Sequence, residues 1–281
     1  MRKLRFVYTI CIISAAAVLM SACEGNLFMN LDKPAVPSTS EIAGRDVSTD
    51  SGAEDFMSDV EDWMDAEVLD GDGGTSDAVV NKLAEIYSDA DPDGNLSPEN
   101  KQRAAVMAGE IAIKSNDQAV ELQNNFTDVL GELTDSTTPD PEDLMASLLP
   151  GDLDRSSFNS MIHAYLDAHS AYDYFGSSDL DTNNDGVIDT EDEPLSLTSG
   201  EIGDITQRAV LSFLVYHSVD ILNGSETDGY EDDIDELYGL VTPDTSDDPD
   251  LTGLTDKIES DSGSADQNLI NILNLAGIDF N

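Results

Sequence analysis

Apolar residues recur every three or four positions along most of the chain from residue 53 onward. Phe56, Val60, Trp63 and Met64 are one example, and this spacing places side chains on one face of a helix. The same pattern predicts helices over residues 76–88, 104–113, 120–133, 144–149, 158–175, 205–222, 234–241, 251–258 and 268–275. Few stretches alternate with period two, as half-buried strands do, so the pattern predicts an all-α fold.

The links between the predicted helices are short, and two of them, 134–141 and 243–249, are rich in Pro and Asp. Short links favour antiparallel neighbours, so we expect an irregular helical bundle or stacked helical hairpins with about nine helices. The run Val210-Leu-Ser-Phe-Leu-Val-Tyr216 is apolar at almost every position. This run predicts that helix 205–222 is the buried central helix.

Residues 23–52 lack this periodicity and contain Pro34, Pro37 and a run rich in Ser, Thr and Gly. Such a composition predicts a disordered, flexible tether. The rest of the chain, residues 53–281, is predicted to form an acidic helical domain with one sizeable core or two small ones.

The formal net charge is −47, with 59 acidic and only 12 basic residues. This balance argues against binding nucleic acid or anionic lipid head groups. Asp outnumbers Glu by 41 to 18. Three explanations remain open: ion binding over many weak sites, a solvation layer of the halophilic type, or a solvated surface that repels other anionic surfaces.

The segment with the most specific chemistry is residues 181–192, Asp-Thr-Asn-Asn-Asp-Gly-Val-Ile-Asp-Thr-Glu-Asp. Oxygen donors stand at positions 1, 3, 5, 9 and 12, with Gly186 at position 6 and Ile188 at position 8. Gly186 permits a sharp turn, and alternate side chains of such a loop can face one cation. The predicted ligands are Asp181, Asn183, Asp185, Asp189, Asp192 and the backbone carbonyl of Val187. We expect Ile188 to anchor the loop to a core or to a partner loop.

A second copy of the pattern lies at residues 89–100 and has Gly94 at position 6. The predicted ligands are Asp89, Asp91, Asp93, Ser97, Asn100 and the backbone carbonyl of Asn95. This loop follows the predicted helix 76–88. A new helix is predicted to start at its end, with Ser97 as N-cap and Pro98 at the first helical position.

Both loops resemble the calcium loop of the EF-hand family. The family has a bidentate Glu at position 12, where this chain has Asp192 and Asn100. The shorter Asp192 is similar to dockerin-like variants and implies weaker affinity or tolerance of magnesium. Pro194 blocks a normal exiting helix downstream, so the loop with the better ligands has the poorer flanks. The alternative is that both segments are solvated, Asp-rich turns.

The N-terminus combines basic Arg2, Lys3 and Arg5 with an apolar stretch, residues 6–20. It continues into Met20-Ser-Ala-Cys23, which resembles a bacterial lipobox. The resemblance implies a signal peptide over residues 1–22, lipidation of Cys23 and a membrane contact through that lipid. Glu24 after the cysteine implies an outer-membrane destination in the cell envelope. The alternatives are cleavage without lipidation or an uncleaved anchor.

No nucleophile elbow, P-loop, dinucleotide fingerprint or HExxH pair is present in the sequence. Cys11 and Cys23 are the only cysteines; Cys11 lies in the predicted signal peptide, and Cys23 is the predicted lipidation site. His163 and His169, near Asp167 and Asp173, fit a structural aromatic cluster better than a metal site. We therefore expect a non-enzymatic, lipid-anchored protein whose loops bind calcium for structural stabilisation. An acidic hydrolase is the least favoured class.

The alternative function is that of an adaptor that binds a partner protein. Leu83-Ala-Glu-Ile-Tyr87, followed by a second helix over 105–113, resembles a tetratricopeptide unit with an inserted ion loop. The resemblance covers about 35 residues, and no further repeat of that period is found.

Overall fold

The computed structural model describes residues 37–69, 73–88, 96–133, 147–151, 153–177, 180, 185, 188, 197–223, 230–241 and 267–278. Within these ranges the fold is all-α, as predicted, with nine helices and no strand. The helices are α2 (Thr39–Ala43), α3 (Asp50–Asp65), α4 (Gly73–Tyr87), α5 (Pro98–Lys114), α6 (Asp117–Leu133), α8 (Arg155–Ser177), α9 (Ser199–Asn223), α10 (Glu231–Val241) and α12 (Gln267–Leu275). All of them except α2 overlap a helix that the apolar spacing predicts.

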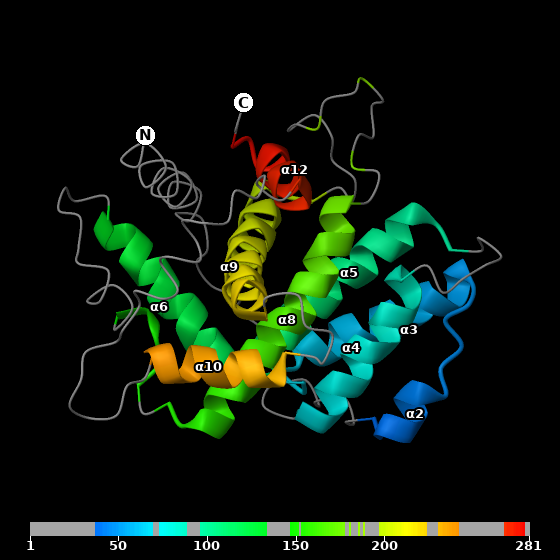
Figure 1. Ribbon diagram of the computed structural model, residues 1–281. Coiled ribbons are helices and arrows are strands. Elements are labelled where there is room, and N and C mark those ends of the chain that lie inside the picture. The colour runs from blue at the N-terminus through cyan, green and yellow to red at the C-terminus, as the bar shows by residue number, and fades with distance from the viewer. Residues whose placement is uncertain are drawn as a thin grey trace.

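Helix α8 lies at the centre of this irregular bundle and packs against α4, α5, α6, α9, α10 and α12 (Figure 1). Phe158, Tyr165 and Tyr172 follow one another at seven-residue steps along it, and all three are buried. Residues seven apart lie on the same side of a helix after two turns. This aromatic stripe therefore forms the middle of the hydrophobic core.

The prediction that 205–222 is the central helix is wrong, because α9 buries only part of its surface. Phe213 and Val210 are in the core, but Leu214 is 40% exposed. Helix α9 packs against α5, α8, α10 and α12. A continuous apolar run shows that a helix has apolar side chains on several faces, and it does not show how many of those faces find a neighbour.

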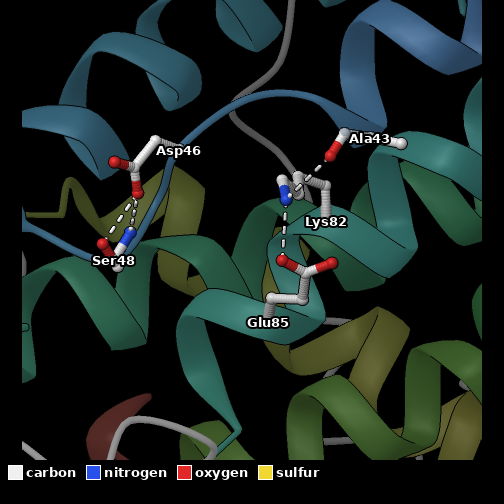
Figure 2. Close-up of polar contacts among 5 residues, drawn as sticks. All are labelled: Ala43, Asp46, Ser48, Lys82 and Glu85. Atoms are coloured by element: carbon white, nitrogen blue, oxygen red, sulfur yellow. Dashed lines mark hydrogen bonds and ion pairs between the residues drawn. The ribbon is translucent and has the colours of Figure 1, made fainter.

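The segment before α3 is folded onto the domain. Ile42 of α2 is 0% exposed, and Val47 is also buried in the core. Figure 2 shows Lys82 of α4, whose Nζ donates to the carbonyl of Ala43 at 3.4 Å and to Glu85 Oε2 at 2.7 Å. The Lys82 side chain is only 7% exposed. A buried ammonium group needs such partners, and the bond to Ala43 links α2 to α4.

Residues 37–52 therefore belong to the helical domain, whereas the sequence placed them in the tether. Ser38 and Glu41 form a capping box at the start of α2, and Thr49 caps α3. Helix α2 has only five residues, which is too short for apolar periodicity to be visible. The domain boundary predicted at residue 53 is thus too far along the chain.

Several predicted features lie outside the described residues. They are the signal peptide 1–22, Cys23, the first part of the tether and the helix at 251–258, together with most of the helix at 144–149. Among the helices that the structure describes, none is long and apolar enough to cross a membrane.

Candidate ion-binding loops and a polar cleft

The exit of the upstream loop, residues 96–100, is fixed to the domain. Leu96 is buried in the core. Ser97 caps α5 by accepting a hydrogen bond from the Asn100 amide at 3.3 Å, and Pro98 is the first helical residue, as predicted. The Ser97 amide donates to Asp50 Oδ1 at 2.7 Å. The end of this loop is therefore tied to the first turn of α3.

Asn100, the predicted position-12 ligand, lies in the same network. Its side-chain amide donates to Asp50 Oδ1 at 2.9 Å and to Glu54 Oε1 at 3.4 Å, and the residue is only 5% exposed. Hydrogen bonds from Ser97 and Asn100 hold the pKa of the Asp50 carboxyl below its usual value. Ser97 and Asn100 thus have structural partners, and their role as cation ligands stays a prediction.

The downstream loop is anchored by apolar side chains. Leu180, directly before the loop, is buried in the core, while Ile188 within it and Leu197 after it are partly buried against the core. The expectation that Ile188 anchors its loop to a core is therefore confirmed. Thr198 then starts α9 with a reciprocal pair, because its amide donates to Glu201 Oε2 at 2.7 Å and its Oγ1 accepts from the Glu201 amide at 3.3 Å.

The other predicted ligands lie outside the described residues. They are Asp89, Asp91, Asp93 and Asn95 upstream and Asp181, Asn183, Val187, Asp189 and Asp192 downstream. Asp185 is described and exposed. In the described part of the chain, no group of three or more His, Cys, Asp or Glu side chains could hold a metal ion.

A polar cleft with a volume of about 450 Å³ lies between α4, the α5–α6 link and α8. The polar residues that line it are Asp77, Asn81, Ser115, Asn116, Ser160, His163 and Asp167. Asn116 and Ser160 close one side through a hydrogen bond of 2.8 Å. His163 Nε2 lies 3.2 Å from Glu231 Oε1 of α10. The cleft therefore brings together carboxylate, imidazole, amide and hydroxyl groups from distant parts of the sequence.

Asp77 and Asp167 are both exposed residues, yet the surrounding protein disfavours the charged form of each carboxyl. Partial burial raises the pKa of Asp77. It also raises the pKa of Asp167, where the charge of His163 works against the rise and that of Asp77 adds to it. The sequence indicated only His163 and Asp167, which stand four residues apart on one helix. Asp77, Asn81 and Ser160 were missed because single acidic and polar residues carry little information in so acidic a chain.

His169, by contrast, lies in an aromatic cluster, as we expected. Its ring stacks on Tyr216 with centroids 3.8 Å apart and meets the edge of Phe213 at 4.5 Å. These contacts join α8 to α9. His169 is thus a packing residue between the two helices.

A mostly buried ion pair crosses the bundle from α5 to α9. Arg208 Nη2 lies 3.4 Å from Glu110 Oε1, and the Arg208 side chain is only 11% exposed. Lys114 reaches the same Glu110 oxygen at 2.6 Å. Gly109, next to Glu110, makes room for the ring of Tyr172, because a Cβ there would lie 2.6 Å from Tyr172 Cζ. The cluster fixes how α5, α8 and α9 cross.

Three further cations of the described residues form ion pairs between segments. Ion pairs join Arg45 to Asp59, Arg103 to Glu61 and Arg155 to Asp235, in addition to the pairs of Lys82, Lys114 and Arg208. Arg103 links α5 to α3, and Arg155 links α8 to α10. The few basic residues therefore lie mainly where one segment crosses another.

No protein-family model, curated protein or solved structure matches the chain.

Proposed function

We propose that the chain is a non-enzymatic, lipid-anchored protein of the cell envelope whose two EF-hand-like loops bind calcium and stabilise the helical domain. The observation that carries the proposal is that each loop is attached to the core through residues that the structure describes. Asn100 and Ser97 bind Asp50 at the exit of one loop, and Ile188 packs against the core within the other. A cation that orders such a loop restrains the helices on both sides of it.

The energetic reason is linkage between binding and folding. Calcium binds oxygen ligands that the folded loop brings together, so binding adds to the free energy of unfolding. At a calcium concentration of about 100 times Kd, one site contributes about 2.7 kcal/mol. Neutralised carboxylates also reduce self-repulsion in a chain with a net charge of −47.

Thermal unfolding of the chain from residue 24 onward tests the calcium proposal. We expect calcium to raise Tm relative to EDTA at matched ionic strength, and magnesium to raise it less. Asp181→Ala and Asp89→Ala should each remove part of this shift, whereas Asp55→Ala, an exposed change on α3, should leave it intact. An equal Tm in calcium and EDTA contradicts the proposal.

The lipid anchor is tested separately. Metabolic labelling with a fatty acid should label the wild-type chain, and Cys23→Ala should abolish the label and release the protein from the membrane fraction. Release without loss of label, or labelling of the Cys23→Ala variant, contradicts the anchor at this residue.

A second candidate function is that of an adaptor for a partner protein. The observation that favours it is the pairing of α4 with α5 as a helical hairpin that packs on α8, with an open cleft along the junction. A photo-crosslinking residue at Asn81, in the cleft, should then give one discrete protein adduct in cells. The same residue at Asp55 serves as the control position. Equal adducts from both positions count against an adaptor site at the cleft.

A further inference from the structure

Asp77 and Asp167 line the cleft as exposed residues, and only His163 offsets part of the charge of Asp167. No lysine or arginine lines the cleft among the described residues. Six lysines and arginines of the described ranges are paired with other carboxylates. His163, the one group in the cleft that can become cationic, is directed to Glu231. The charge of the two carboxylates is therefore available to a ligand.

The other walls of the cleft suit a small organic molecule. The amides of Asn81 and Asn116 and the hydroxyl of Ser160 offer hydrogen-bond acceptors and donors around the opening. Val80, Ala112 and Ala164 supply apolar surface from three different helices. Small-molecule pockets combine apolar surface with a few convergent polar groups in a volume of about 300–1,000 Å³. The volume of about 450 Å³ falls within this range.

We propose that this cleft binds a small aliphatic amine. Its ammonium group lies beside Asp77 and Asp167, and its methylene chain lies against Val80, Ala112 and Ala164. The ammonium group is a strong donor and makes charge-assisted hydrogen bonds with carboxylates. Repulsion between the two carboxylates raises the free energy of the empty cleft. The positive charge of a bound ammonium group offsets this repulsion.

Charge and geometry favour an amine over other ligands. The net charge of −47 repels anionic ligands and attracts cationic ones. A metal ion would need several ligands at short, fixed distances, and no such group of His, Cys, Asp or Glu exists in the described part of the chain. An ammonium group needs only acceptors within hydrogen-bond distance, and the apolar surface beside the carboxylates has no role in binding a bare metal ion.

The test is calorimetric titration of the chain from residue 24 onward with 1,4-diaminobutane, at constant ionic strength and with calcium present throughout. We expect saturable binding of one molecule per chain. Asp77→Asn and Asp167→Asn should each weaken the affinity about tenfold, since each removes a charge-assisted contact. Asp55→Asn removes the same charge from an exposed site on α3 and should leave the affinity unchanged. The uncharged 1,4-butanediol should not bind.

Three outcomes would overturn the proposal. One is diamine binding that does not saturate, and another is an equal loss of affinity in Asp55→Asn and Asp77→Asn, which indicates general attraction to an acidic surface. The third is displacement of the diamine by added calcium at constant ionic strength, which makes the cleft a metal site. Circular dichroism of each variant establishes that it is folded. Because calcium is constant during the titration, the result is independent of whether the loops stabilise the domain.

Discussion

Glu110 and Asp167 are carboxylates on two neighbouring helices of the bundle, and their surroundings shift their pKa values in opposite directions. Burial alone would raise the pKa of Glu110, but Arg208 and Lys114 lower it below its usual value. Asp167 is the more exposed of the two, yet partial burial raises its pKa, and Asp77 adds to the rise. The position of a cation, more than the degree of burial, therefore decides the charge state that each site favours.

The difference shows how the chain uses its few basic residues. Arg208, Arg103 and Arg155 each link two helices, and the cleft receives none of them. A paired carboxylate such as Glu110 stabilises the crossing of helices. An unpaired one such as Asp167 opposes folding slightly and remains available for binding.

The largest expected effect comes from removing the cation of the paired site. Arg208→Met keeps an unbranched apolar side chain, similar to the aliphatic part of Arg208, but removes the cation that Glu110 receives from α9. We expect a loss of about 3 kcal/mol in the free energy of unfolding, because a mostly buried charge that loses a buried partner is strongly unfavourable, and Glu110 keeps only the more exposed Lys114. Urea unfolding at pH 7 measures it.

Arg103→Met is the matched control. Arg103 and Glu61 also join two helices, at 2.5 Å, but their side chains are 35% and 50% exposed. Exposed ion pairs contribute about 0–1 kcal/mol. If the two variants lose the same stability, burial of the Arg208 pair has no special role and the comparison with Asp167 fails.

The next largest loss of stability is expected at Gly109, which lies beside the Arg208–Glu110 pair. Gly109→Ala places a Cβ 2.6 Å from Tyr172 Cζ, so the buried ring has to move. We expect a loss of about 2 kcal/mol from overpacking, measured by thermal or urea unfolding.

Gly239→Ala on α10 is the control for Gly109→Ala and should increase stability. A Cβ there meets nothing within 4 Å, so the gain in helix propensity is not offset by a clash. We expect a gain of about 0.5–1 kcal/mol. A neutral or stabilising Gly109→Ala would show that Tyr172 is free to shift within the core.

Local signals made parts of this molecule predictable. Ser97 and Pro98 are adjacent in sequence, and the N-cap and first helical position need only neighbouring residues to be recognised. Ile188 stands at a fixed place in the loop pattern, so its anchoring role could be inferred from spacing. The helices other than α2 follow from the spacing of their apolar residues.

Features made from distant residues could not be predicted. Asp77, Asn116 and Asp167 meet only because α4, α5, α6 and α8 pack as they do, and apolar periodicity shows which face is buried without naming its partner. The central place of α8 over α9 was missed for this reason. Asp50, which binds the end of the upstream loop from α3, is 47 residues from Ser97 and carries no local signal.

Asp50 extends the comparison to a carboxylate that is balanced by hydrogen bonds alone. Asp50→Ala removes the acceptor of the Ser97 amide and of the Asn100 side chain. We expect a loss of about 1 kcal/mol at pH 7 by urea unfolding. Because the pKa of Asp50 is lowered in the folded protein, this stability is present above the unfolded pKa of about 3.9. It is lost as the pH falls through the folded value.

Asp55→Ala on the same helix is the control for this change, and it should have little effect at either pH. If Asp50→Ala and the wild-type chain lose stability in parallel as the solution is acidified, the hydrogen bonds to Asp50 do not account for its lowered pKa.

The smallest expected effect is a gain in stability, and it concerns Asp167, the carboxylate without a lysine or arginine partner. Asp167→Asn removes a charge that the folded cleft disfavours, so in the absence of amine we expect a gain below about 0.5 kcal/mol at pH 7. The pKa of Asp167 is raised in the folded protein, so the folded state binds its proton more tightly than the unfolded state. Protonated Asp167 therefore contributes fully to stability at a pH below its pKa in the unfolded chain. This contribution is lost as the pH rises through its pKa in the folded protein. The gain from Asp167→Asn should therefore be present at pH 7 and disappear near pH 3, as measured by paired urea titrations. A loss of stability at pH 7 would show that the Asp167 carboxylate has a stabilising partner in the folded protein and that the cleft is not open to an amine.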